Sequence, residues 1–103
     1  FSVRWLRQQG LDPAMLSAIR VTGDSMERTL FDGDEILVDR TPGALRDGIH
    51  VVRLDDALLV KRLDTSRPGT ITLISDNTAY RPVDFPAAEV QVIGRVVWKS
   101  GRI

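Results

Sequence analysis

The 103-residue chain contains no cysteine, which excludes disulfides, thiol nucleophiles and zinc sites with cysteine ligands. Neither sign of charge is in excess, because 14 Lys and Arg residues balance 14 Asp and Glu residues. No basic block stands out, so the chain lacks the charge pattern of a nucleic-acid-binding domain, and any DNA binding must reside in another domain. With neither a secretory signal nor an apolar run of membrane length, we expect a cytoplasmic protein without a membrane partner.

The residues that are present indicate one folded domain. Hydrophobic residues make up 43% of the chain, which argues against disorder, and the length is sufficient to bury a single core. Because the first residue is Phe1 and not methionine, we expect a fragment of a longer protein.

Residues 1–20 are expected to form an entry segment with short helices, ahead of a main domain over residues 21–103. The sequence VRWLRQQGLDPAMLSAI predicts two helical pieces interrupted at Gly10. Asp12 suits the N-cap of the second piece, and Pro13 suits its first helical position.

The rest of the chain predicts a mainly β fold. Five runs rich in Val, Ile and Leu indicate strands of a mostly antiparallel sheet or barrel: EILVD, GIHVVRL, ALLVKRL, TITLIS and VQVIGRVVWK. The polar, proline-containing segment DNTAYRPVDFPAAE predicts a long ordered loop. The last run fits either an exposed edge used for dimerisation or a place in the core, and its residue types favour the core.

The stretch VTGDSMERTLF places Ser25 directly after a glycine and an aspartate. Asp24 and Glu27 have the spacing of a capping box, which predicts a short helix that opens at Ser25 and ends near Leu30 or Phe31. Unpaired N–H groups at such an opening, with Asp24 and Met26 flanking the serine, suit a developing oxyanion. Ser25 is therefore a candidate nucleophile. The alternative is an ordinary serine in the first turn of a helix.

Lys61 is the candidate base. Strand alternation places Leu59, Lys61 and Leu63 on one face and Arg62 on the other. Arginine does not easily lose its proton, so we expect Arg62 to reach solvent and Lys61 to enter the apolar side. Burial disfavours the charged amine and lowers the pKa of a lysine. The alternative is a lysine at the strand edge whose amine extends to water.

The other polar candidates have simpler explanations. His50 is the only histidine, and it fits a half-exposed strand position. Asp32 and Asp34 flank Gly33 and indicate a turn, while the string DGDE lacks the ligand pattern of a calcium loop. We therefore expect neither a metal site nor a cofactor.

Four stretches carry a family resemblance: VTGDSMERTLFDGDEILVD, DGIHVVRLDDALLVKRL, LISDNTAYRPVDF and VIGRVVW. With them, the chain from Val21 to Trp98 resembles the C-terminal peptidase domain of LexA-like and phage-type repressors, a family related to signal peptidase. The serine of GDSM, the lysine of VKRL and the SDN segment with its tyrosine occur in the order typical of that family. The residues WLRQQGLDPAML add weaker similarity.

The resemblance implies a compact, mostly β domain with a Ser-Lys dyad, in which Ser25 is the nucleophile and Lys61 the general base. It implies cleavage of the protein's own linker at a bond between a small residue and glycine, stimulated by the RecA filament in the SOS response. It also implies a homodimer, and operator DNA bound through an upstream helix-turn-helix domain. The SDN segment with its tyrosine and the VIGRVVW stretch are expected to be structural.

Two departures from the family pattern affect these expectations. Arg28 stands where the family usually has proline, so we expect the short helix after Ser25 to be held less rigidly. The bond that the family cleaves lies farther upstream than the 24 residues that precede Ser25, and Gln9-Gly10 is too near the serine. No cleavage site is therefore assigned within the chain.

Three functions from different classes remain open. The first is the self-cleaving domain of a repressor. The second is a non-cleaving dimerisation or sensing domain of a phage-type regulator, in which the dyad is an inheritance. The third is a signal-peptidase-like enzyme, which is disfavoured because such enzymes act at membranes and this chain contains no apolar run of membrane length.

Overall fold

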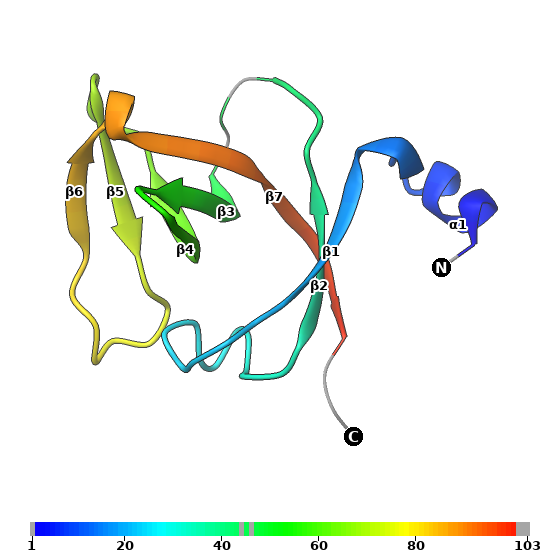
Figure 1. Cartoon of the computed structure of the whole chain (residues 1–103), viewed down its shortest axis with the longest axis horizontal. Helices are drawn as coiled ribbons and strands as arrows, with labels where there is room; N and C mark the ends of the chain where they lie inside the picture. Colours follow the sequence, from blue (N-terminus) through cyan, green and yellow to red (C-terminus); the bar gives the residue numbers. More distant parts are fainter. Residues whose placement is uncertain (1, 44, 46, 101–103) are drawn as a thin grey trace.

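The computed structural model describes residues 2–43, 45 and 47–100, and these form one antiparallel sheet of seven strands (Figure 1). The order across the sheet is β1-β2-β7-β3-β4-β5-β6. The mainly β fold predicted above is confirmed. The bounds of the strands are β1 (Leu16–Arg20), β2 (Glu35–Asp39), β3 (Gly48–Leu54), β4 (Ala57–Asp64), β5 (Thr70–Ile74), β6 (Val83–Pro86) and β7 (Val90–Ser100).

The N-terminal helix α1 (Val3–Gln8) has the two ends that its sequence encodes. The side chain of Ser2 accepts a hydrogen bond from the backbone N–H of Trp5 at 3.0 Å and caps the first turn. Gly10 follows the helix with a φ of +75°, a left-handed conformation that glycine adopts without strain. The predicted interruption at Gly10 is therefore confirmed.

The second helical piece is shorter than predicted. It is a single 3-10 turn, η1 (Pro13–Met15), capped by the Asp12 side chain. The prediction that the helix continues through Ile19 is wrong, because Leu16–Arg20 form strand β1 and pair with β2. Ile19 packs against the core there, and pairing with β2 supplies the backbone hydrogen bonds that a helix would otherwise provide.

The five predicted strands are present as β2, β3, β4, β5 and β7. Strand β7 lies between β2 and β3, so it is an interior strand and not an exposed edge. The prediction of a loop before it is wrong over part of its length, because Val83–Pro86 form the edge strand β6 against β5 and Ala87–Glu89 form the 3-10 turn η2. Pro86 is tolerated because it ends an edge strand, where a missing N–H costs little.

Strand β7 passes very close to strand β2. A Cβ atom at Gly94 would lie 2.5 Å from the backbone oxygen of Asp39 and 2.6 Å from Cγ1 of Val38. The pairing of β2 with β7 shifts register between Leu37 and Val38, next to this contact. The close approach of the two backbones therefore requires glycine at this position.

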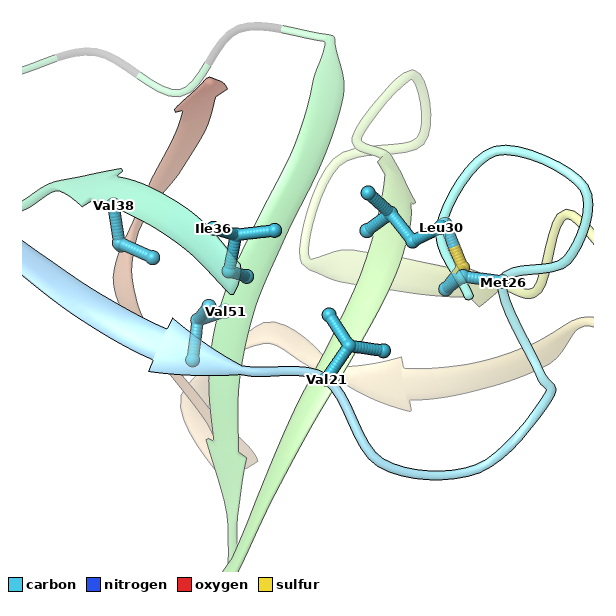
Figure 2. Packing of buried hydrophobic residues seen from close by; sticks show 6 residues of the cluster. All are labelled: Val21, Met26, Leu30, Ile36, Val38 and Val51. Carbon is cyan, nitrogen blue, oxygen red and sulfur yellow. The ribbon is translucent and has the colours of Figure 1, made fainter. Parts of the chain in front are cut away.

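Both faces of the central strands bury side chains. Val51 belongs to one core cluster and its neighbour Val52 belongs to the other. The first cluster also contains Val21, Met26 and Leu30, which follow β1 in the sequence (Figure 2). These three side chains pack the segment between β1 and β2 against the sheet. In the part of the chain that the structure describes, no helix is long and apolar enough to cross a membrane.

Candidate functional site

Ser25 lies in a series of turns between β1 and β2. The prediction that a short helix opens at Ser25 is therefore wrong. The backbone N–H groups of Thr29 and Leu30 both donate to the carbonyl oxygen of Met26 at 2.8 Å. The carboxylate of Asp24 accepts a hydrogen bond from the hydroxyl of Tyr80 at 2.5 Å. The backbone N–H of Glu27 donates to the carbonyl oxygen of Asp24 at 3.2 Å and not to its side chain, so the expected capping box is not formed.

The turns around Ser25 are closed at their base and anchored in the core. The N–H of Gly23 donates to Oδ1 of Asp32 at 2.8 Å, and the N–H of Phe31 donates to Oδ2 of Asp34 at 2.9 Å. The prediction that these two aspartates form a turn is confirmed. Met26, the residue after the serine, is 2% exposed. Ser25 itself is half-buried, and it lies between the hydrogen-bonded Gly23 and the buried Met26.

Residues 75–80, the segment that follows β5, hold the other side of the Ser25 turn. The backbone N–H of Asn77 donates to the carbonyl oxygen of Ser25 at 3.0 Å. The side-chain amide of Asn77 donates to the carbonyl oxygen of Asp24, also at 3.0 Å. Together with the bond from Tyr80 to Asp24, these contacts fix the backbone on both sides of the serine hydroxyl.

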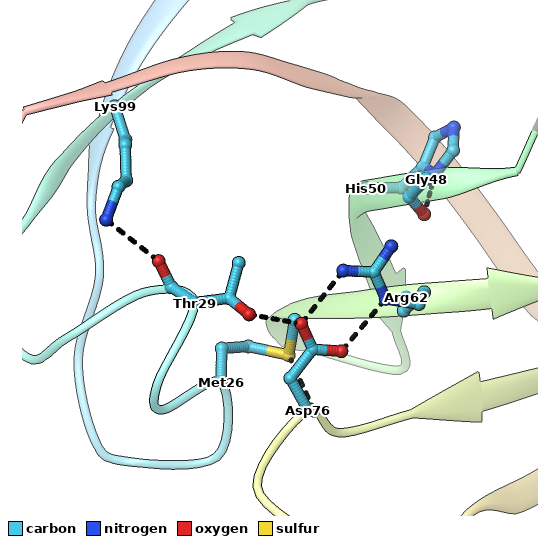
Figure 3. Close-up of polar contacts among 7 residues, drawn as sticks. All are labelled: Met26, Thr29, Gly48, His50, Arg62, Asp76 and Lys99. Atoms are coloured by element: carbon cyan, nitrogen blue, oxygen red, sulfur yellow. Dashed lines mark hydrogen bonds and ion pairs between the residues drawn. The ribbon is translucent and has the colours of Figure 1, made fainter.

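Asp76 ties the Ser25 turn to strand β4 (Figure 3). Its carboxylate accepts hydrogen bonds from Nε and Nη2 of Arg62 at 2.9 Å each and from Oγ1 of Thr29 at 2.6 Å. Its N–H donates to Sδ of Met26 at 3.5 Å. The bonds from Arg62, and then from Thr29, hold the pKa of Asp76 below its ordinary value, while burial opposes them. Arg62 does reach solvent as predicted, with 43% of its side chain exposed, but in an ion pair.

The amine of Lys61 is enclosed on two sides by the same 75–80 segment. Nζ donates to Oγ of Ser75 at 2.8 Å, and it lies 5.8 Å from the centre of the Tyr80 ring. Burial lowers the pKa of Lys61 below the ordinary value of 10.5. The Tyr80 ring works in the opposite direction, because an aromatic face attracts the charged form. The Lys61 residue as a whole is half-buried.

The structure brings Ser25 and Lys61 to one segment without a direct hydrogen bond between them. Among the residues described, the one hydrogen bond of the Lys61 amine goes to Ser75. Within the same residues, the backbone N–H groups of Ser25 and Met26 have no acceptor. The site therefore combines a hydroxyl, an amine of lowered pKa and two available N–H donors along residues 75–80.

His50 is buried, with 3% of its surface exposed, so the prediction of a half-exposed position is wrong. Strand β3 has neighbours on both sides, β4 and β7, and this interior place encloses the ring. Nδ1 of His50 lies 2.9 Å from the carbonyl oxygen of Gly48, to which it donates (Figure 3). Burial, and then the nearby Arg95 charge, lower the pKa of His50, while the Gly48 bond opposes them. The neutral ring thus has a structural explanation.

A hollow of about 960 Å³ has Trp5, His50, Arg95 and Trp98 among its lining residues. Neither Ser25 nor Lys61 lines it. Within residues 2–43, 45 and 47–100, no group of three or more His, Cys, Asp or Glu side chains is placed to hold a metal ion.

The sequence analysis missed the contribution of the 75–80 segment to this site. Ser75, Asp76, Asn77 and Tyr80 were expected to be structural, yet each contacts the Ser25 turn or the Lys61 amine. One signal was available, since three consecutive polar residues, SDN, directly follow an apolar strand. Polar groups at the end of a buried strand are costly unless they find partners, and the partners here are the Ser25 turn and strand β4.

Comparisons with known proteins found one matching family model and several related regulators. A family model described as Peptidase S24-like matches residues 2–97. The chain is 35% identical over 107 residues to the HTH-type transcriptional regulator PrtR of Pseudomonas aeruginosa, covering 97% of this chain and 42% of that protein. It is 36% identical over 93 residues to the LexA repressor of Streptomyces avermitilis, covering 89% of this chain and 38% of that protein. The chain thus spans about two fifths of these relatives.

Proposed function

Because the chain belongs to the Peptidase S24-like family, we propose that it is the self-cleaving domain of a LexA-like transcriptional repressor. Ser25 is the nucleophile and Lys61 is the general base. The observation that carries the proposal is the common attachment of both residues to one segment. Asn77 binds the Ser25 carbonyl while Ser75 binds the Lys61 amine, and only one residue separates Ser75 from Asn77.

The proposed reaction is acyl transfer from the protein's own linker. Neutral Lys61 accepts the proton of the Ser25 hydroxyl while Oγ attacks the carbonyl carbon of the scissile peptide. The protonated amine then gives that proton to the nitrogen of the leaving strand, and water later releases the acyl group from Ser25. Lowering of the Lys61 pKa by burial supports this role, because a charged ammonium has no lone pair with which to accept a proton.

The oxyanion of the tetrahedral intermediate is assigned to the backbone N–H groups of Ser25 and Met26. Among the described residues these two donors have no acceptor, and burial of the Met26 side chain keeps the second of them in place. Asp24 contributes by anchoring the backbone before the serine through Tyr80 and Asn77. Preorganised donors of this kind typically contribute about 10²- to 10³-fold to the rate.

The whole protein is proposed to act as a cytoplasmic homodimer that binds operator DNA. The relatives are named as an HTH-type transcriptional regulator and as LexA repressors, and the chain spans about two fifths of their length. Operator binding would reside in a helix-turn-helix domain upstream of these residues. The cleaved linker would lie between the two domains, and a RecA filament is the proposed activator.

One observation favours a second candidate, a non-cleaving dimerisation or sensing domain. The Lys61 amine binds Ser75 instead of Ser25 in this structure. Catalytic hydrogen bonds are often long or absent before a substrate is bound, so the self-cleaving function remains the first candidate.

The experiment that separates the two candidates is self-cleavage of the full-length protein between pH 7 and 10, without any activator. Wild type is expected to cleave its linker faster as the pH rises, since the neutral fraction of Lys61 increases. Ser25→Ala and Lys61→Ala are expected to remain intact, and so is Lys61→Arg, which keeps the charge but cannot act as a base. An exposed serine remote from the site, Ser66, provides the control Ser66→Ala. Intact wild type at every pH, also with RecA filament and ATP, would support the non-cleaving domain.

A further inference from the structure

Ser75 makes a contact with the candidate base that the dyad does not require. Its Oγ accepts a hydrogen bond from Nζ of Lys61 at 2.8 Å, and the residue is only 8% exposed. We propose that Ser75 is a positioning residue that orients the amine of Lys61 toward Ser25. This inference rests on the proposed function of Lys61 as the general base.

The sheet places Ser75 at a fixed position relative to Lys61. Arg62 pairs with Ile74, and Leu63 pairs with Leu73, across β4 and β5. Continuing this antiparallel register by one step sets Ser75 opposite Lys61, on the same face of the sheet. The position of the hydroxyl is therefore determined by strand pairing, whereas a lysine side chain alone has four rotatable bonds.

The chemistry of a neutral amine explains why such an anchor matters. Neutral Nζ has two N–H donors and one lone pair. When Ser75 accepts one N–H, rotation about the last bond of the side chain is restricted, and the lone pair remains available for the proton of Ser25. The same hydroxyl gives the ammonium form a polar partner beside two apolar neighbours along β4, Leu59 and Leu63.

Few other groups near the amine titrate in the same pH range. His50 lies opposite Lys61 on β3, and burial lowers its pKa below 6.5, so it is already neutral at pH 7. Tyr80 faces the amine from the 75–80 segment, and its hydrogen bond to Asp24 raises its pKa above 10.0. Arg62, the next residue on β4, is paired with Asp76 and stays charged. A change between pH 7 and 10 therefore reports on Lys61.

The first test measures the contact directly. Lys61 and Lys99 are the only lysines of the chain, so ¹³C-labelled lysine gives two signals that a Lys99→Arg variant assigns. Ser75→Ala is expected to lower the pKa of Lys61, because it removes an acceptor that favours the ammonium form. Ser75→Thr keeps the hydroxyl and is expected to retain the wild-type value, as is the control Ser66→Ala. An unchanged Lys61 pKa in folded Ser75→Ala would overturn the assignment.

The second test follows linker cleavage by the full-length protein from pH 7 to 10. Ser75→Ala is expected to cleave about 10- to 100-fold more slowly at its plateau, since a misplaced catalytic group costs rates of this order. The cleavage rate of Ser75→Ala is expected to begin its rise at a lower pH than that of wild type, because the pKa of Lys61 is lower. A loss of folded protein alone would not shift the pH profile. Ser75→Thr is expected to recover most of the rate.

The outcomes separate the two proposals. Wild-type rate and pH profile in Ser75→Ala would overturn the positioning role. Cleavage by Ser25→Ala together with none by Ser75→Ala would also overturn it, and would identify Ser75 as the nucleophile. If wild type does not cleave but Ser75→Ala lowers the Lys61 pKa, the contact is established and the proposed function fails.

Discussion

The ion pair between Asp76 and Arg62 offers a quantitative test of how the site is held together. It joins the segment after β5 to strand β4, next to Lys61, and Asp76 also binds the Ser25 turn through Thr29. Replacing Asp76 by alanine removes three hydrogen bonds to a carboxylate that is 14% exposed. The change should therefore loosen the turn as well as destabilise the fold.

The expected magnitude follows from the exposure of the two partners. A hydrogen bond to a charged group typically contributes about 1.5–3 kcal/mol, whereas an exposed ion pair contributes only about 0.2–1 kcal/mol. The Arg62 side chain is 43% exposed, so water replaces part of what it loses. We expect Asp76→Ala to lower the free energy of unfolding by about 2 kcal/mol, with about 1 kcal/mol arising from coupling to Arg62.

The assay is a double-mutant cycle in urea at pH 7 with wild type, Asp76→Ala, Arg62→Ala and the double variant. The exposed pair Arg67 and Asp84, whose side chains are 62% and 52% exposed, provides a matched control in which the coupling should be smaller. A coupling energy between Asp76 and Arg62 below about 0.3 kcal/mol would refute the reasoning, because independent sites add within about that error.

Three further predictions concern packing and pH. Met26→Ala is expected to lower the free energy of unfolding, measured in urea, by about 2–5 kcal/mol, because the Met26 side chain is buried. Leu58 is exposed, so Leu58→Ala should lower it by less than about 0.5 kcal/mol. A loss for Met26→Ala as small as that for Leu58→Ala would contradict the anchoring of the turn by Met26. Gly94→Ala is expected to lower the free energy of unfolding by about 1–3 kcal/mol, and so to lower the melting temperature, because its Cβ would meet strand β2. Gly43 has open space at the Cβ position, so Gly43→Ala should leave the melting temperature unchanged. Equal melting temperatures for the two variants would contradict the close contact between Gly94 and β2. The fold lowers the pKa of Asp76 below 3.8, so the ionised carboxylate stabilises the protein fully above that pH. This stabilisation is lost as the pH falls through the pKa of Asp76 in the folded protein. The difference in urea midpoint between wild type and Asp76→Asn should therefore shrink below about pH 4, and a constant difference would contradict this prediction.

Much of the fold could be predicted from the sequence because the strands carry strong local signals. Runs such as EILVD and GIHVVRL are apolar, β-branched and bounded by turn residues, and they form β2 and β3 at the predicted residues. Local signals failed where distant contacts decided the structure. Leu16–Arg20 became a strand because β2 lies beside it, and the Asp24 carboxylate, expected to form a capping box, accepts a hydrogen bond from Tyr80.

The candidate site was predicted only in part for the same reason. Ser25 and Lys61 were singled out from their local patterns and from the family resemblance, and their shared attachment to residues 75–80 was not. The bond from Lys61 to Ser75 joins residues 14 positions apart, and the bond from Tyr80 to Asp24 joins residues 56 positions apart. Such contacts depend on the register of β4 with β5 and on the path of the following segment, which composition and periodicity do not specify.

The most direct test of the proposed chemistry is the pKa of the Lys61 amine in the wild-type chain, measured by ¹³C NMR of labelled lysine with Lys99 as the second signal. A general base at this position requires an amine that loses its proton more readily than a lysine in water. We predict a titration midpoint below 10.5, because burial disfavours the ammonium form. A midpoint at or above 10.5 would contradict the assignment of Lys61 as the base.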